Sequence, residues 1–137
     1  MSLFVDTSIW YAATSHSDLN NERARAILSS GESLYVTDHV LAETWSLIRN
    51  RIHRGAAEQF WEGMRSGIAV IEPVGLADLE AAWQIGIAFP DQDFSLVDRA
   101  SFAVMRRLGI ERAASFDSHF AVFRYGPKQR YAFDVVR

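Results

Sequence analysis

Short apolar runs alternate along the chain with longer segments of helical periodicity. The runs that predict strands lie at residues 3–5, 34–37 and 68–71, with weaker ones at 112–116 and 131–136. The segments that predict helices lie at residues 9–13, 20–30, 38–53, 56–65, 77–88 and 95–108. Strands that alternate with helices favour an α/β fold, in which helices cover both faces of a mostly parallel sheet.

The sequence predicts a single domain over residues 1–137. Its length is that of one ordinary domain, its three prolines are scattered, and no repeat or linker interrupts the pattern. The 49% hydrophobic and 23% charged residues are typical of a globular protein. No apolar run approaches the ~18 residues of a membrane span, and the N-terminus lacks the basic start of a signal peptide. We therefore expect a cytoplasmic protein with no membrane association.

Two features of the composition narrow the possible chemistry. The absence of cysteine excludes a disulfide framework, a zinc finger, an iron–sulfur site and a thiol nucleophile. Lys and Arg together number 14 and Asp and Glu number 17, so the formal net charge is −3. The chain as a whole does not attract nucleic acid, and any such binding must come from a local basic patch.

Aspartates follow two of the predicted strands. Asp6 comes directly after the strand at 3–5, and Asp117 follows the weaker strand at 112–116. In open parallel sheets ligands bind outside the carboxyl ends of the strands, so these carboxylates would meet if their strands are neighbours. The alternative is that each aspartate only caps the next helix, because Asp is a favoured N-cap residue.

Glu43 lies in the long predicted helix at 38–53. Val40 and Leu47, three residues before it and four after it, belong to the apolar stripe of that helix. Glu43 therefore lies at the border of the stripe, where its carboxylate points along the seam between helix and sheet. The alternative is a rim residue whose charge stays in water.

Asp98 lies in the first turn of the predicted helix at 95–108. Ser95 and Asp98 have the spacing of a capping box, which alone would explain this aspartate. Asp98 also shares a helix face with Phe102, where an unpaired anion would be costly to desolvate and a cation would remove the cost. Asp93, in the loop before this helix, is a weaker supporting candidate.

Convergence of these acids would place four like charges together and would require a compensating charge. No basic residue recurs beside them. Oxygen ligands favour Mg²⁺ or Mn²⁺ over zinc or copper. A carboxylate-held magnesium ion can lower the pKa of a bound water and polarise a phosphoryl oxygen, which suits phosphodiester hydrolysis. The sequence leaves open whether one ion or two bind.

Four motifs around these acids resemble, in order, those of the PIN-domain family, and in particular the ribonuclease toxins of VapBC-type toxin–antitoxin pairs. The motifs are Phe4-Val5-Asp6-Thr7-Ser8-Ile9-Trp10, Leu41-Ala42-Glu43-Thr44, Phe94-Ser95-Leu96-Val97-Asp98-Arg99-Ala100 and Ala114-Ser115-Phe116-Asp117-Ser118-His119-Phe120. The resemblance covers nearly the whole chain, and no acidic position of the family pattern is missing.

The resemblance implies a three-layer PIN-domain sandwich with a central, mostly parallel sheet, and a metal-dependent endoribonuclease that hydrolyses RNA. The catalytic residues and ligands of Mg²⁺ or Mn²⁺ that it implies are Asp6, Glu43, Asp98 and Asp117. The hydroxyls of Ser8 and Ser115 would orient these carboxylates. It further implies a homodimer and a cognate antitoxin whose C-terminal segment lies across the active cleft. The open alternatives are a PIN nuclease that is not a toxin and a non-catalytic PIN module that binds RNA or protein.

Binding of RNA requires local cations, and basic residues gather at three places. The candidate RNA contacts are Arg49, Arg51, Arg54, Arg106, Arg107 and Lys128. The first two groups follow the ends of helices 38–53 and 95–108, where cations also interact favourably with the helix dipole, so a structural role is the alternative. His119, two residues after Asp117, could act on a leaving group, but a partly buried or surface histidine is the simpler interpretation.

The helices at 38–53 and 56–65 carry a stripe of large side chains, namely Trp45, Phe60, Trp61 and Met64. Core packing is the simplest explanation for such a stripe. A dimer face or an antitoxin groove is the alternative, because exposed apolar patches usually mark partners.

Two other phosphoryl-handling classes place an aspartate at the end of the first strand, and the sequence fits neither. Haloacid-dehalogenase-like phosphatases need Asp-x-Asp where this chain has Asp6-Thr7-Ser8, and receiver domains need an acidic pair before that aspartate. The chain also lacks a Gly-x-x-x-x-Gly-Lys loop and a Gly-x-Ser-x-Gly elbow, which argues against an NTPase or a serine hydrolase.

Overall fold

The structure is a computed structural model that describes residues 1–137. Strands and helices alternate along the chain, as the apolar pattern predicts. In chain order the elements are β1 (Ser2–Val5), α1 (Thr7–Thr14), α2 (Asn21–Leu28), β2 (Ser33–Thr37), α3 (Asp38–Arg51), α4 (Arg54–Arg65), β3 (Val70–Glu72), α5 (Leu76–Ala88), α6 (Leu96–Leu108), β4 (Arg112–Ala114), α7 (His119–Val122), the 3-10 helix η1 (Pro127–Gln129) and β5 (Asp134–Val136).

The five strands form one sheet in the order β3-β2-β1-β4-β5, and every neighbouring pair is parallel. From β1 the chain moves to β2 on one side, and from β4 it moves to β5 on the other side. The direction of winding therefore switches between β1 and β4, which are hydrogen-bonded neighbours with Phe4 opposite Ala113. In open α/β sheets the crevice at such a switch point is where ligands bind.

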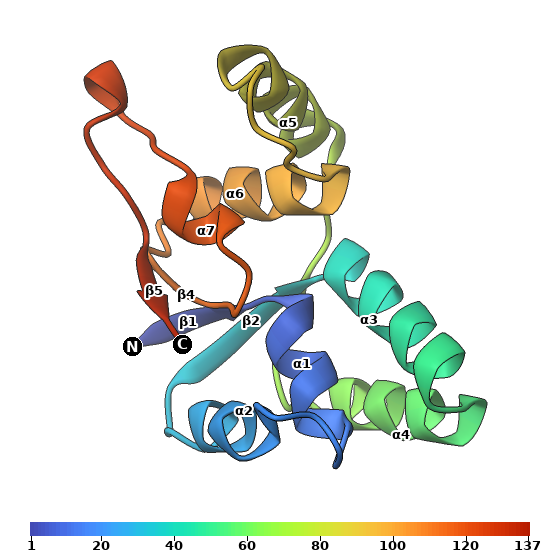
Figure 1. Cartoon of the computed structure of the whole chain (residues 1–137). Helices are drawn as coiled ribbons and strands as arrows, with labels where there is room; N and C mark the ends of the chain where they lie inside the picture. Colours follow the sequence, from blue (N-terminus) through green and yellow to red (C-terminus); the bar gives the residue numbers. More distant parts are fainter.

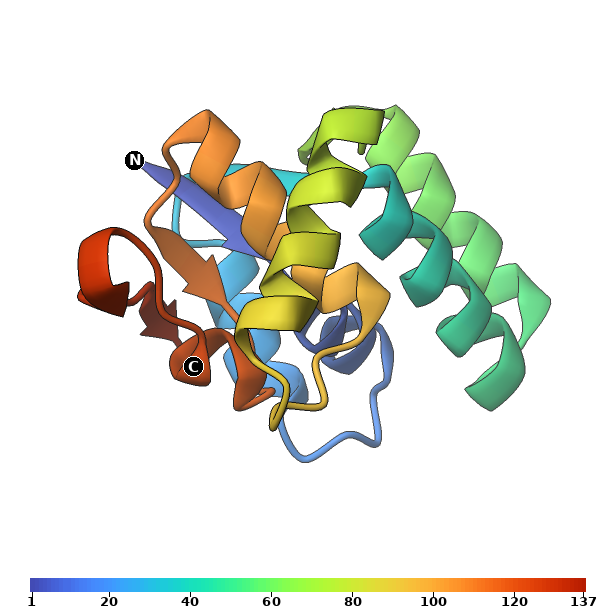
Figure 2. The ribbon, with the colours of Figure 1, turned by 90° about the horizontal axis from the view of Figure 1, so that it is seen from above.

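Helices cover both faces of the sheet, so the predicted three-layer arrangement is confirmed. In Figure 1, α1, α2 and α4 lie below the sheet, whereas α6 and α7 lie above it with α5 packed outside α6. Helix α3 stands at the edge of the sheet and packs against α1, α4 and α6. Figure 2 shows α3 and α4 running side by side, next to the pair formed by α5 and α6. None of the helices is both long and apolar enough to span a membrane.

Phe102 of α6 lies at the centre of a buried aromatic cluster. Its ring centroid is 4.4 Å from that of Phe123, 5.0 Å from Phe120 and 5.2 Å from Phe94. Phe120 in turn stacks on Phe4 of β1 at 6.2 Å. Aromatic pairs of this kind contribute ~0.5–1.5 kcal/mol beyond the area that they bury. The cluster joins β1, α6 and α7, so it holds the starts of α6 and α7 near the end of β1.

The predicted strands and helices are all present, and the differences lie at their ends. The predicted helix at 38–53 ends at Arg51, because the backbone turns at Ile52 and the ring of His53 caps α4 by accepting a hydrogen bond from Ala56 N–H at 3.0 Å. Helix α7 was not predicted, since its four residues are too few to show a helical period. Strand β4 is confirmed but short, and its buried Ala113 and Ala114 have weak strand propensity.

Arg107 near the end of α6 ties three elements together. Its guanidinium donates to both carboxylate oxygens of Asp78 in α5, at 2.8 and 3.0 Å, and to Glu72 Oε1 at the end of β3, at 2.9 Å. The hydrogen bonds from Arg107 lower the pKa of Asp78, whose side chain is only 6% exposed.

We expect Arg107→Gln to lower the free energy of unfolding by about 1–2 kcal/mol at pH 7. Hydrogen bonds to charged groups contribute ~1.5–3 kcal/mol, and solvent at the half-exposed guanidinium screens part of this. A depressed carboxyl pKa stabilises the fold above the unfolded value of ~3.9 and ceases to do so as the pH falls through the folded value. The difference from wild type, measured by denaturant unfolding, should therefore shrink below about pH 4.

Arg65→Gln is the matched control, because Arg65 pairs with Glu62 in an ion pair that is exposed on both sides. Its loss should change stability by less than about 0.5 kcal/mol. Equal losses in the two variants would contradict a stabilising role for Arg107.

Candidate active site

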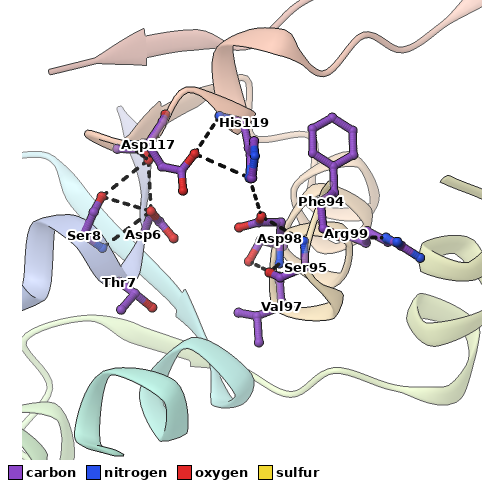
Figure 3. A network of polar contacts seen from close by, with 12 residues as sticks. Asp6, Thr7, Ser8, Phe94, Ser95, Val97, Asp98, Arg99, Asp117 and His119 are labelled. Carbon is purple, nitrogen blue, oxygen red and sulfur yellow. Dashed lines mark hydrogen bonds and ion pairs between the residues drawn. The ribbon is translucent and has the colours of Figure 1, made fainter. Parts of the chain in front are cut away.

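The carboxyl ends of β1 and β4 lie side by side at one edge of the sheet. Asp6 follows β1, and its backbone N–H donates to the carbonyl of Ala114, the last residue of β4, at 3.0 Å. Asp117 follows β4 after a further two residues. The two aspartates placed by the sequence at strand ends therefore come together, as Figure 3 shows.

A cavity of about 430 Å³ opens at this edge of the sheet. Side chains from four separate parts of the chain line it, and the four candidate acids are among them: Asp6, Glu43, Asp98 and Asp117. Ser8 also lines the cavity, Ser115 is fully buried next to Asp6, and Asp93 is exposed outside it. The structure thus brings together acids that are up to 111 residues apart, from Asp6 to Asp117 (117 − 6 = 111).

Asp6 is a carboxylate buried without a cationic partner. Its side chain caps α1, and its Oδ2 accepts hydrogen bonds from the hydroxyls of Ser8 at 3.0 Å and Ser115 at 2.9 Å. Burial raises the pKa of Asp6 to about 6; the two serine hydroxyls lower it, and the charge of Asp98 raises it further. Hydroxyls can orient this group but cannot neutralise it, so the site favours a cation.

Glu43 is held by a threonine that sequence reasoning did not single out. Thr7 Oγ1 donates to Glu43 Oε1 at 2.7 Å and accepts a hydrogen bond from Thr44 Oγ1 at 3.2 Å. Thr7 and Thr44 are both fully or nearly buried between α1 and α3. Their positions directly after Asp6 and Glu43 are the signal that would have identified them.

His119 lies between Asp98 and Asp117, as Figure 3 shows. Its Nδ1 is 2.8 Å from Asp98 Oδ2 and 3.4 Å from Asp117 Oδ1, and its backbone N–H donates to Asp117 Oδ1 at 2.8 Å. Burial alone would lower the pKa of His119, but the hydrogen bond to Asp98 and the charges of Asp117, Asp98 and Asp93 raise it. A basic group therefore does lie beside the acids, contrary to the sequence-based view that none recurs there.

The predicted capping box at the start of α6 is present and coexists with the cavity. Ser95 Oγ accepts from Asp98 N–H at 3.0 Å, and Asp98 Oδ2 accepts from Ser95 N–H at 3.1 Å. The side chain of Asp98 thus caps α6 and also lines the cavity. The same holds for Asp6, so the two interpretations left open by the sequence are compatible.

In each of the four carboxylates the hydrogen bonds between side chain and protein fall on one oxygen. The bonded oxygens are Asp6 Oδ2, Glu43 Oε1, Asp98 Oδ2 and Asp117 Oδ1. The other four oxygens are hard donors available to a cation, and Mg²⁺ and Mn²⁺ prefer such ligands. No three His, Asp or Glu side chains are placed so that one ion could contact all of them as they lie. The donor set fits a magnesium or manganese ion, provided that the carboxylates turn toward it.

Only one of the candidate RNA-contacting bases lines this cavity, namely Arg51 of α3. Arg54 pairs with Glu58, and Arg49 donates to the side chain of its neighbour Asn50. Arg106 lies over the ring of Tyr125 at 4.1 Å from its centroid, and Arg107 forms the ion pairs described above. Lys128 lies in η1 with a positive φ of 58°.

Comparison with known proteins agrees with this architecture. A model of the PIN domain matches residues 3–124 of the chain. The chain belongs to the PIN-domain family. Its curated relatives include the 23S rRNA-specific endonuclease VapC20 of Mycobacterium tuberculosis, which is 37% identical over 121 residues, 87% of this chain and 92% of the relative.

Solved structures share the fold of this PIN domain. The crystal structure of M. tuberculosis VapC20, described as a sarcin–ricin loop cleaving toxin, superposes with a TM-score of 0.83 at 33% identity, covering 87% of this chain and 92% of that chain. VapBC2 from Rickettsia felis, bound to a promoter DNA fragment, has a TM-score of 0.66 at 10% identity, covering 86% of this chain and 89% of that chain. FitAcB from Neisseria gonorrhoeae has a TM-score of 0.62 at 15% identity, covering 85% and 88%. The last two show the fold alone.

Asp6→Asn should stabilise the metal-free PIN domain at alkaline pH. A buried acid with a raised pKa destabilises the fold once it ionises, so wild type should lose stability as the pH rises from about 4 to above 6. The variant should exceed wild type by about 1–3 kcal/mol at pH 8 and match it near pH 4, as measured by denaturant unfolding with a chelator present.

Asp91→Asn, at an exposed loop position, is the control and should leave stability within about 0.5 kcal/mol. If the Asp6→Asn protein is less stable than wild type at pH 8, the charge of the buried Asp6 carboxylate is compensated by its surroundings, and the prediction is wrong.

Proposed function

We propose that this PIN domain is an endoribonuclease that hydrolyses phosphodiester bonds of RNA with the help of Mg²⁺ or Mn²⁺. The observation that carries the proposal is the meeting of four carboxylates from four parts of the chain around one cavity, each with one oxygen free of hydrogen bonds. We assign the metal ligands to Asp6, Glu43, Asp98 and Asp117. A bound divalent ion supplies an activated water and polarises a phosphoryl oxygen.

The surrounding side chains hold these ligands in place. Ser8 and Ser115 orient the carboxylate of Asp6 from two sides, and Thr7 orients that of Glu43. His119 keeps Asp98 and Asp117 at the same side of the cavity. In metal sites, loss of a group that orients a ligand by a hydrogen bond typically lowers metal affinity or activity by about 10- to 100-fold.

We further propose that ribosomal RNA in the cytoplasm is the substrate and that the cellular role is that of a toxin. The support is the likeness to VapC20, whose name describes a 23S rRNA-specific endonuclease and whose structure is described as a sarcin–ricin loop cleaving toxin. The alternatives are a PIN nuclease outside toxin–antitoxin pairs and a PIN module that binds RNA or protein without cleaving it.

A toxin of this kind requires an antitoxin, and we propose that part of it covers an apolar groove between α3 and α4. Leu41, Trp45 and Trp61 line this groove together with Ala42 and Ser46. Trp61 is 45% exposed, and the indole Nε1 of Trp45 is buried without a hydrogen-bond partner. Met64 is in the core and Phe60 packs against it, so the predicted stripe is partly core and partly surface.

We also propose a homodimer, as the family resemblance implies. Helix α5 leaves two large apolar side chains exposed one turn apart, Trp83 and Ile87, at 62% and 59%. Exposed apolar surface of this kind is typical of an interface between proteins.

The proposed nuclease activity is tested by incubating 23S rRNA, and a fragment that contains its sarcin–ricin loop, with the protein and Mg²⁺ or Mn²⁺. Asp6→Asn, Glu43→Gln, Asp98→Asn and Asp117→Asn should each reduce cleavage by more than about 100-fold, because changes around metal ligands already cost about 10- to 100-fold. A chelator should abolish the activity of wild type.

Glu80→Gln, on the exposed side of α5, is the control for the loss of one negative charge and should cleave like wild type. Full cleavage by Asp6→Asn and Asp98→Asn, or cleavage unaffected by the chelator, would overturn the proposal.

Trp61→Ser should weaken binding of the proposed antitoxin by at least about tenfold, since tryptophan is enriched among the residues that dominate interface energies. The dissociation constant is measured by calorimetry. Undiminished binding would place the antitoxin elsewhere on the surface.

A further inference from the structure

The cavity at the acids continues along the pair of helices α1 and α3. Glu43, Leu47 and Arg51 line it from three successive turns of α3, at intervals of four residues. Thr7 and Tyr11 line it from α1, also four residues apart. This part of the cavity is therefore a channel, lined by both polar and apolar side chains, that begins at the carboxylates and runs outward between the two helices.

The two helices are joined at both ends of this channel. At the inner end Thr7 bonds to Glu43 and to Thr44. At the outer end the guanidinium carbon of Arg51 lies 5.5 Å from the centroid of the Tyr11 ring, within the range of a cation–π interaction. The ring restricts where the Arg51 side chain can lie and keeps its charge beside the channel.

Arg51 is the only lysine or arginine that lines the cavity. It forms no ion pair and no side-chain hydrogen bond, although the lining includes the acid Asp18 at the same end of α1. By contrast, Arg54 and Arg107 are committed to carboxylates. Arg51 is exposed, and its guanidinium is free to meet an incoming anion at the mouth of a channel whose other charged side chains are acids and His119.

Arg51 lies in the outer part of the cavity, about two turns of α3 beyond Glu43. The eight residues from Glu43 to Arg51 correspond to about 12 Å along the axis of α3. Tyr11 keeps the guanidinium on the side away from the hydrogen bond between Thr7 and Glu43. This separation favours contact between Arg51 and a phosphate next to the one that is cleaved.

We propose that Arg51, held by Tyr11, binds a phosphodiester that flanks the scissile one and so sets the direction in which the RNA strand leaves the carboxylates. The inference rests on the proposed ribonuclease function and adds to it a fixed second contact point. A strand anchored at two points presents one particular bond to the metal site, so Arg51 contributes to the choice of cleavage position.

The test uses the sarcin–ricin loop RNA fragment and compares Arg51→Gln with Arg25→Gln. Arg25 is an exposed arginine of α2 outside the cavity, so its replacement removes the same charge elsewhere. Arg51→Gln should raise KM by about tenfold with kcat changed less than about threefold, as expected for a contact made equally in ground and transition states. The slope of log affinity against log salt, measured by RNA binding with Asp98→Asn as background, should fall by about 0.7 for one phosphate contact. Arg25→Gln should change neither quantity.

Uncharged linkages locate the contact. Methylphosphonates are placed one at a time at the positions around the cleavage site of the same RNA. At one flanking position, a methylphosphonate should weaken binding to the protein that retains Arg51 by as much as the Arg51→Gln substitution does. The same methylphosphonate should leave binding to the Arg51→Gln protein unchanged. Arg51→Lys, which keeps the charge but loses the planar fork, should restore part of the affinity.

The outcomes separate this inference from the function on which it rests. If wild type cleaves the RNA while Arg51→Gln and Arg25→Gln behave alike, the inference is overturned and the nuclease function stands. A lower kcat at unchanged KM, or the same methylphosphonate pattern in both proteins, also overturns it. If wild type neither binds nor cleaves RNA, the proposed function fails as well.

Discussion

The carboxylate of Asp6 is buried where β1 and β4 end, and most of the site depends on the constraints that this burial imposes. A buried anion must receive hydrogen bonds, and the donors come from Ser8, two residues on, and from Ser115 at the end of the neighbouring strand. The register that pairs Val5 with Ala114 places Ser115 beside Asp6. A slip of one residue would turn Ser115 to the other face of the sheet. Ala113, Ala114 and Ser115 are fully buried, so this end of β4 is shielded from water.

The aromatic packing above the sheet holds the elements that carry the acids in position. Phe102 and Phe120 join α6 and α7 to β1, and their contacts hold the residues that carry Asp98 and His119 in position. The acids themselves oppose folding, because their charges repel and Asp6 is desolvated. A site that lowers the stability of the fold must be offset by stabilising contacts elsewhere. In this chain the aromatic core provides such contacts.

Helix capping and the proposed metal binding share the same side chains in this protein. Asp6 and Asp98 each cap a helix with one oxygen, and Asp117 accepts a hydrogen bond at the start of α7 in the same way. A cap restricts the rotamer of the side chain and leaves its second oxygen without a hydrogen bond to the protein. Local sequence patterns alone favoured capping, whereas the set of four acids favoured a metal site, and one geometry is compatible with both roles.

Much of the architecture could be predicted from sequence, because apolar periodicity and glycine or proline stops are local properties of the chain. They determined the order of strands and helices and the acids at the strand ends, and the family resemblance joined those acids into one site. The tertiary structure alone decided which side chains meet. It placed His119 between Asp98 and Asp117, paired Thr7 with Glu43, and brought Arg51 out of six candidate bases to the cavity. Apart from the contact between His119 and Asp117, these contacts join residues far apart in sequence, so they depend on strand order and helix packing rather than on spacing along the chain.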